Sequence, residues 1–278
     1  MRSTSLICLF SFTFTHFTHA QTLQKNWETD TLFKVPESVK YSKQHQLLFV
    51  SNIEGTQPWA KDGKGSIAKL DFNGKLIDGE WVAGLDAPKG MAIRGNKLFV
   101  ADLKTIKTID IKQSNIIHTL EIPGAQTLND LTIDDKGILY VSDSRGKKVY
   151  RIKNNEAEVW LDSISGLRGP NGLLFYKDNL YVLDAGALYE TRSDKKLIKI
   201  AEGMEGGTDG IEAYSDDAFI VSCWSGVIYF VKKDGTKTTL LDTRKEGVNS
   251  ADIGYHPEKK IIYVPTFWKN KVVAYQLQ

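Results

Sequence analysis

A short apolar pattern recurs six times along this chain of 278 residues and sets the spacing of its predicted strands. The copies are LLFVSN, KLFVAD, ILYVSD, NLYVLD, AFIVSC and IIYVPT, and their shared valines are Val50, Val100, Val141, Val182, Val221 and Val264. Successive valines lie 50, 41, 41, 39 and 43 residues apart. A period near 40 with β-branched and aromatic residues is typical of β-propeller blades. The pattern therefore predicts an all-β fold, a six-bladed β-propeller of four-stranded blades.

Each repeat divides into four strand-like segments separated by turn residues. In the third repeat, an inner strand within 129–135 precedes strands within 138–143, 147–153 and 157–163, with Gly137 at the first turn. Apolar residues alternate within these segments, and Gly, Asp and Asn bound them. No segment shows a persuasive helical period, so we expect strands and turns throughout.

The last repeat contains only three such segments. A further apolar segment, TLFKV over residues 31–35, precedes the first repeat. We expect this N-terminal strand to complete the last blade and close the ring, because closure protects the edges that open sheets expose.

The first repeat carries an insertion over residues 53–65, IEGTQPWAKDGKG, between its second and third strands. It is polar and glycine-rich and contains Trp59. Long loops on a rigid scaffold often carry function, and a tolerated surface insertion is the alternative.

The chain is 41% hydrophobic and 25% charged with a net charge of +2, as in a soluble globular protein. No run of Lys or Arg exceeds two residues, so we expect no nucleic-acid partner, which would need a concentrated basic face. The expected partner is a small-molecule substrate. The sequence says nothing about protein partners.

The first twenty residues differ from the rest, with Arg2 as their only charge. An apolar stretch over 6–17 precedes Thr18-His19-Ala20, which predicts a secretory signal peptide over 1–20 and a propeller over 21–278. The protein would then be periplasmic or secreted, with no membrane span in the mature chain, because the apolar stretch is too short. A disordered or misannotated N-terminus is the alternative. Cys223 then has no disulfide partner, and we expect it to be a small buried hydrophobe.

Polar residues begin the inner strands about a dozen positions before the shared valines. They are Glu37, Pro88-Lys89, Asn129, Asn171, Asp209 and Asp252. Because inner strands line the axis of a propeller, these side chains should converge at one mouth of the channel. Carboxylate and amide oxygens suit a hard divalent cation, for which we expect Ca²⁺ and leave Mg²⁺, Mn²⁺ or Zn²⁺ open. Taken singly, each residue is also an ordinary turn residue.

The motifs around these positions are Pro36-Glu37-Ser38, Leu128-Asn129-Asp130, Pro170-Asn171-Gly172 and Asp209-Gly210. In this order the chain resembles the SMP-30/gluconolactonase/LRE-like family of six-bladed propellers, across essentially all of the mature sequence. The resemblance implies a calcium-dependent, lactonase-like hydrolase. It implies Glu37, Asn171 and Asp209 as metal ligands, and Asn129 as a ligand or as a residue that holds substrate or water. By the same resemblance Asp209 doubles as the general base.

Two departures from the family pattern bear on the substrate. Thr127 stands where sugar-lactone members carry a substrate-binding arginine, and Ser38 follows Glu37 in place of the usual Gly-Pro. Both leave the metal site intact and make a sugar-acid substrate doubtful. Lys89 is a candidate replacement cation for substrate binding.

The second strands return to the same mouth and end in Asn52, Asp102, Asp143 and Asp184. These could form an acidic floor or cap turns. Trp59, Trp224 and Trp268 are candidate substrate-binding residues on an aromatic rim, and packing between blades is the alternative for the last two.

The favoured function is an exported, metal-dependent hydrolase of a lactone or related ester. A non-catalytic NHL-like propeller that binds a ligand or a protein, with a structural metal, is the main alternative, because a fold does not settle function. A strictosidine-synthase-like propeller is a third hypothesis. Serine-hydrolase chemistry has no support, because no G-x-S-x-G elbow is present.

Overall fold

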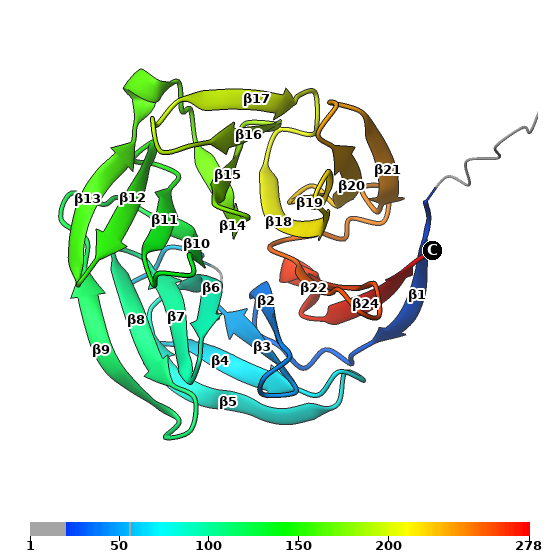
Figure 1. The fold of residues 1–278 in the computed structure, drawn as a ribbon. Helices are drawn as coiled ribbons and strands as arrows, with labels where there is room; N and C mark the ends of the chain where they lie inside the picture. Colours follow the sequence, from blue (N-terminus) through cyan, green and yellow to red (C-terminus); the bar gives the residue numbers. More distant parts are fainter. Residues whose placement is uncertain (1–20, 56) are drawn as a thin grey trace, which may run out of the picture.

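The computed structural model describes residues 21–55 and 57–278. These residues form six four-stranded antiparallel sheets arranged in a ring around a central channel (Figure 1). The predicted six-bladed propeller is thus confirmed. The predicted signal peptide lies outside the described residues and stays a prediction.

Each blade runs from an inner strand at the channel to an outer strand at the rim. Blade 1 contains β2 (Pro36–Ser42), β3 (Leu47–Asn52), β4 (Gly65–Leu70) and β5 (Leu76–Leu85); blade 2 contains β6 (Pro88–Arg94), β7 (Lys97–Asp102), β8 (Thr105–Asp110) and β9 (Asn115–Glu121); blade 3 contains β10 (Leu128–Ile133), β11 (Leu139–Asp143), β12 (Lys148–Lys153) and β13 (Glu156–Leu161). Blade 4 contains β14 (Pro170–Tyr176), β15 (Asn179–Asp184), β16 (Ala187–Thr191) and β17 (Leu197–Ala201); blade 5 contains β18 (Thr208–Ser215), β19 (Ala218–Cys223), β20 (Val227–Lys232) and β21 (Lys237–Asp242); blade 6 contains β22 (Gly254–His256), β23 (Ile261–Pro265), β24 (Val272–Leu277) and β1 (Leu23–Glu28).

The connections include two short 3-10 turns, η1 (Ser163–Ser165) and η2 (Phe267–Lys269). Within the described residues, no helix has the length and apolar character needed to cross a membrane.

The ring closes through an N-terminal strand, but through a different segment from the one predicted. Strand β1 pairs antiparallel with β24, whereas residues 31–35 form a loop, so the assignment of TLFKV was wrong. The outer strand β1 is mostly exposed and therefore carries few apolar residues to mark it. Phe33 and Val35 are buried instead in two clusters that join blade 1 to blade 6.

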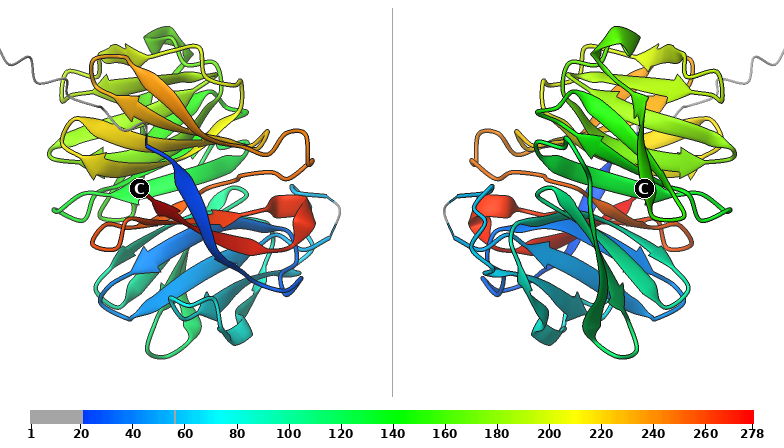
Figure 2. Two further views of the ribbon diagram at one scale, coloured as in Figure 1. Left: turned by 90° about the vertical axis from the view of Figure 1, so that its right-hand side faces the viewer. Right: turned by 90° about the vertical axis from the view of Figure 1, so that its left-hand side faces the viewer.

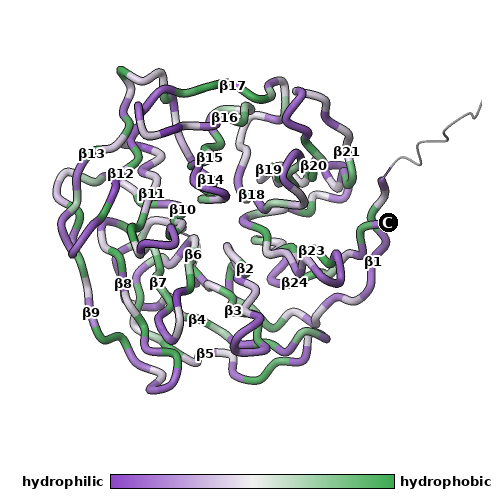
Figure 3. Tube along the Cα trace, in the orientation of Figure 1, coloured by the Kyte–Doolittle hydropathy of each residue, from purple (hydrophilic) through white to green (hydrophobic). Residues whose placement is uncertain are grey.

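The hydrophobic core lies between neighbouring blades, as expected when each sheet must bury both faces. All six pattern valines are buried. Val182, for example, packs with Leu173 of its own blade and with Tyr140 and Val149 of blade 3. Hydrophobic stretches follow the strands, while many connecting turns are hydrophilic (Figure 3). The predicted burial of Cys223 in a strand is confirmed, and burial raises the pKa of its thiol to about 12.

Loops gather unequally on the two faces of the ring. The insertion between β3 and β4, the loop between β21 and β22, and η2 protrude on the same side (Figure 2). The opposite face carries the short turns between first and second strands and between third and fourth strands. The inner strands begin at the face with the long loops, where the sequence places its candidate chemistry.

Candidate functional site

The predicted site residues occupy irregular positions at the start of five inner strands. The ladder to the second strand shifts register between Pro36 and Ser38, Pro88 and Met91, Leu128 and Leu131, Pro170 and Leu173, and Thr208 and Ile211. Glu37, Lys89, Asn129, Asn171 and Asp209 lie inside these shifts. A bulge removes a residue from regular pairing and redirects its side chain, here into the channel mouth.

Serines of the second strands satisfy backbone groups that the bulges release. The Ser51, Ser142 and Ser222 hydroxyls accept the N–H groups of Ser38, Asp130 and Gly210 at 3.0, 3.0 and 2.8 Å. Each acceptor serves the residue that follows a site residue. The irregular backbone therefore keeps its hydrogen bonds while the preceding side chain stays available.

One cavity of about 510 Å³, here called the central cavity, brings all eight predicted site residues together. Its lining consists of Glu37, Lys89, Asn129, Asn171, Asp209, Trp59, Trp224 and Trp268 with Pro58, Gly207 and Phe267. Five polar side chains come from the bulges of blades 1 to 5, and the tryptophans come from the insertion, from the short turn after β19 and from η2. Sequence spacing alone thus identified every charged and amide side chain of this cavity.

A buried ion pair lines the central cavity. The Lys89 ammonium Nζ lies 3.3 Å from Oε1 of Glu37, and the two side chains are only 5% and 4% exposed. Burial raises the pKa of Glu37, and the Lys89 charge opposes that rise. The other carboxylate oxygen, Glu37 Oε2, is buried and has no hydrogen-bond partner among the described residues.

Asn171 and Asp209 form a second polar pair from neighbouring blades. The Asn171 amide Nδ2 donates to Oδ1 of Asp209 at 3.1 Å. The amide oxygen of Asn171, its own Oδ1, points elsewhere and is buried without a hydrogen-bond partner in the described part of the chain. Burial, together with the charges of Glu37 and Asp252, holds the pKa of Asp209 well above its usual range. Protonation of Asp209 is therefore easy when no cation is nearby.

Asn129 is held differently. Its Nδ2 donates to the Ser144 hydroxyl at 3.2 Å, and that hydroxyl donates to the carbonyl of Pro170 at 2.7 Å. The amide is thereby anchored between blades 3 and 4 with its oxygen not engaged by this bond. This suits either role considered for it, as a ligand or as a residue that orients substrate or water.

The donor set fits an oxygen-liganded divalent cation. Two carboxylates and two amides line the cavity, and the orphaned oxygens of Glu37 and Asn171 are lone-pair donors that a hard cation would satisfy. Among the described residues no three His, Cys, Asp or Glu side chains form a metal-binding group, so the site depends on its amides. The ion and its identity stay predictions.

Asp252, which sequence spacing grouped with this ring, does not line the cavity. Its Oδ2 accepts a hydrogen bond from the Ser38 hydroxyl at 2.5 Å, and burial raises its pKa to about 7. Asp252 lies outside the ladder between β22 and β23, which begins at Gly254, and pairs instead with β2 through an isolated parallel bridge at Ser38.

The polar side chains at the ends of the second strands hold neighbouring loops by hydrogen bonds, so the alternative of an acidic floor is wrong. Each side chain accepts backbone N–H groups from the loop that precedes the inner strand of its own blade. The bonds join Asn52 to Lys34, Asp102 to Asp86 and Ala87, Asp143 to Gln126 and Thr127, and Asp184 to Arg168 and Gly169, at 2.6–3.3 Å. These hydrogen bonds fix the loop that leads into each bulge.

The aromatic rim consists of two parts. Phe267 packs edge-on against both Trp224 and Trp268, with ring centroids 5.7 and 4.7 Å away. Phe267 is buried, whereas the two tryptophans that it contacts are exposed. Trp59 comes from the insertion and carries the guanidinium of Arg145 over its ring at 4.6 Å. The sequence analysis missed Phe267. Its position next to Trp268, just after the second strand of blade 6, could have identified it.

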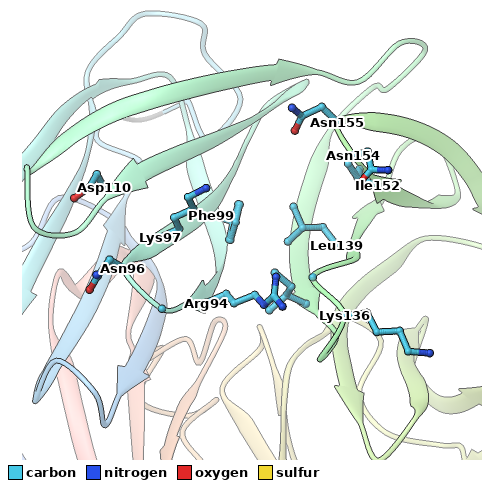
Figure 4. A pocket seen from close by; sticks show the side chains of 13 residues that line it. Arg94, Asn96, Lys97, Phe99, Asp110, Lys136, Leu139, Ile152, Asn154 and Asn155 are labelled. Carbon is cyan, nitrogen blue, oxygen red and sulfur yellow. The ribbon is translucent and has the colours of Figure 1, made fainter.

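A pocket on the opposite face of the ring is larger than the central cavity but has fewer groups that could bind a metal or act in catalysis. Figure 4 shows this pocket between blades 2 and 3, with Arg94, Lys97 and Lys136 near its edge. Its one carboxylate, Asp110, accepts the backbone N–H groups of Lys112 and Gln113 in a tight turn. We therefore assign the functional site to the central cavity.

Comparisons with known proteins support the fold. No protein-family model matches the sequence, and no curated protein matches it. A streptogramin B lyase structure aligns with a TM-score of 0.68 at 13% identity, over 93% of this chain and 98% of that one. A catalytically inactive histidine-to-alanine variant of virginiamycin B lyase from Staphylococcus aureus, with quinupristin, aligns with a TM-score of 0.65 at 13% identity, over 93% and 100%. A candidate gluconolactonase aligns with a TM-score of 0.69 at 14% identity, over 94% of each chain.

The chain has the six-bladed propeller fold of gluconolactonase-like proteins. Its structural neighbours are lactonase-like and lyase enzymes. At 13–14% identity this likeness establishes the fold alone, and the reaction has to be argued from the cavity.

Proposed function

We propose that this propeller is an exported hydrolase of a lactone or related ester that uses one divalent cation, Ca²⁺ first among the candidates. The observation that supports it is the pair of buried, unpartnered oxygens, Glu37 Oε2 and Asn171 Oδ1, in one cavity with Asp209. Leaving both without a partner would cost free energy, and one cation would remove that cost.

Glu37, Asn171 and Asp209 would hold the ion, with Asn129 as a fourth ligand or as a residue that orients water. When bound, the cation would polarise the scissile carbonyl and stabilise negative charge on its oxygen. Binding requires ionised carboxylates, so the raised pKa of Asp209 makes the affinity for the ion rise with pH.

Asp209 would act as the general base. It would take a proton from water as the water oxygen forms a bond to the carbonyl carbon, and the carbon–oxygen bond of the ester would then break. Returning the proton to the departing oxygen yields the hydroxy acid from a lactone, or the acid and alcohol from an ester. The amide of Asn171, already bonded to Asp209, would orient this carboxylate.

Lys89 would limit the negative charge of the site. Its ammonium engages Oε1 of Glu37 and leaves Oε2 for the ion, so the two carboxylates and the lysine together carry one net negative charge. The ammonium also faces the cavity, where it could attract a carbonyl or an anionic product.

Two alternatives are less well supported. A non-catalytic, ligand-binding propeller would use the same cavity with a structural metal, and the buried Lys89–Glu37 pair is compatible with such a role. A lyase reaction that uses a histidine has less support, because the lining of the central cavity, within the described residues, contains no histidine.

The test is hydrolysis of a panel of lactones and aryl esters by the mature protein with Ca²⁺, Mg²⁺, Mn²⁺ or EDTA. We expect turnover that requires a metal and is lost in Glu37→Gln. The matched control is Glu156→Gln, the same change at an exposed position on the outer strand β13, which should behave as the wild type. Tight metal binding without turnover on any substrate would favour the binding propeller.

A further inference from the structure

A second cavity opens beside the central cavity on the same face of the ring. This basic groove has a volume of about 660 Å³ and lies between the loops of blades 1, 2 and 3. Trp59 lines both cavities and so forms the wall they share. A ligand seated in the central cavity can therefore extend past one indole ring into the groove.

Four cationic side chains line the basic groove: Lys61, Lys104, Lys107 and Arg145. They come from the insertion of blade 1 and from the hairpins of blades 2 and 3. Within the described residues, Lys107 has a carboxylate at 4.0 Å, that of Asp102, and the other three have no carboxylate within 4 Å. Their charges are thus available to a ligand.

Three carboxylates also line the groove, and two of them are already engaged. Asp102 accepts the backbone N–H groups of Asp86 and Ala87, and Asp86 accepts that of Gly63. Only Glu121, at the exposed outer end of β9, has no such bond among the described residues. The groove therefore presents cations to a ligand while most of its acids face the backbone.

Arg145 is the best-oriented of the cations. Its guanidinium lies over the Trp59 ring at 4.6 Å, a cation–π contact in which the N–H groups can still donate hydrogen bonds to a ligand. The turn that carries it is tied down by the bond from the Ser144 N–H to the Thr127 carbonyl at 3.2 Å. A guanidinium edge matches the two oxygens of a carboxylate or phosphate.

We propose that the substrate is an amphipathic organic anion that spans Trp59. Its apolar ring or acyl part lies in the central cavity among Trp59, Trp224 and Trp268, and its oxyanion, a carboxylate or phosphate, lies in the basic groove against Arg145 with Lys61 and Lys104. The assignment of a substrate rests on the proposed hydrolase function, whereas anion binding in the groove does not.

The test uses phenyl acetate, 4-acetoxybenzoate and 4-acetoxyphenyl phosphate as matched substrates, and phenol and 4-hydroxybenzoate as ligands for calorimetry. A charge-assisted bidentate contact predicts at least tenfold higher kcat/KM for the anionic esters and at least tenfold tighter binding of 4-hydroxybenzoate than of phenol. The better of the two anionic esters distinguishes a carboxylate from a phosphate. Both preferences should weaken at high salt.

Arg145→Gln should remove about tenfold of each preference, taken as the ratio of anionic to neutral probe within the same variant so that any change in overall turnover cancels. Arg145→Lys should restore part of it, since the charge returns without the fork. The double variant Lys61→Gln, Lys104→Gln tests the groove without touching the Trp59 stack. Lys136→Gln removes one charge from the opposite face and should change nothing beyond twofold.

Equal kinetics and binding for neutral and anionic probes, or a preference that survives Arg145→Gln and the lysine double variant, would overturn the proposal. Selective binding of 4-hydroxybenzoate that Arg145→Gln abolishes would support the groove even if no ester is hydrolysed. In that case the hydrolase proposal fails while the groove stands, so the two failures are distinguishable.

Discussion

The inner strand of blade 3 is built differently at its two ends, and the difference separates folding from chemistry. In blade 3, Leu131 to Ile133 pair regularly with Leu139 to Val141, and the following turn is closed by Asp134, whose carboxylate accepts two backbone N–H groups. At the cavity end the same ladder breaks between Leu128 and Leu131. The regular end uses its polar groups in the turn, whereas the bulged end leaves side chains free for a ligand.

Charged pairs show the same contrast along the channel. Lys40 and Glu212 lie three positions beyond Glu37 and Asp209 on β2 and β18, and their charged atoms are 3.4 Å apart. Within the described residues neither leaves a buried polar side-chain atom without a partner, whereas Glu37 at the mouth does. The Lys40–Glu212 pair therefore has no buried polar atom left to satisfy, whereas Glu37 has an oxygen that can bind a cation or a ligand.

The largest effect should follow removal of the base at the bulged end. Asp209→Asn should lower kcat for the best ester about 100-fold or more, because a positioned base contributes roughly 10²–10⁴ to rate. Asp135→Asn, in a turn on the opposite face, is the control and should leave the rate unchanged. Steady-state kinetics at saturating calcium measures both, and comparable rates for the two variants would contradict the base assignment.

Two glycine-to-alanine substitutions compare the two ends of the inner strands through their effect on the free energy of unfolding. A Cβ on Gly172 would lie 2.0 Å from the Asp209 carbonyl oxygen, so Gly172→Ala should cost about 3 kcal/mol of unfolding free energy. Gly95 at the other end has φ +58° and open space, so Gly95→Ala should cost about 1 kcal/mol from backbone strain alone. Urea unfolding measures both. Equal costs would mean that blades 4 and 5 can move apart at the bulge.

Replacing Lys89 tests what its ion pair with Glu37 contributes to stability and to calcium binding. Lys89→Met leaves Glu37 buried and unpaired, which should lower the melting temperature in EDTA. The same change removes a repulsive charge from the ion site, so calcium affinity should rise about tenfold. Calorimetric titration and thermal melts with and without calcium check both directions. Weaker calcium binding would place Lys89 in a supporting role for the ligands.

The last effect concerns the pH dependence of stability. The folded-state pKa of Asp252 is about 7, above its ordinary value near 4, so its ionisation opposes folding. Stability from this group is complete below pH 4 and declines as pH rises to about 7. In EDTA, Asp252→Asn should flatten that decline, by at most about 4 kcal/mol. Urea unfolding at pH 4, 5.5 and 7 measures it, and parallel curves for wild type and variant would refute this assignment.

The repeat of one apolar pattern was enough to predict the blades, because each blade must bury alternate residues against its neighbours. It failed for β1, whose outer position demands little apolar surface, and it misread Phe33 and Val35 as a strand. It also grouped Asp252 with the site, because counting residues cannot reveal that this carboxylate accepts a hydrogen bond from Ser38 and does not line the cavity.

The fold and the polar residues at the channel mouth could be predicted from the sequence, since both follow from periodic position within a repeat. What those residues face depends on segments that the fold brings together. Whether an acid clips a loop, as Asp102 does, or keeps an oxygen free, as Glu37 does, depends on backbone groups brought near it by other segments. The contact between Trp59 and Arg145, which are 86 positions apart in the chain, likewise depends on how the loops of blades 1 and 3 meet at one face of the ring and not on any local pattern.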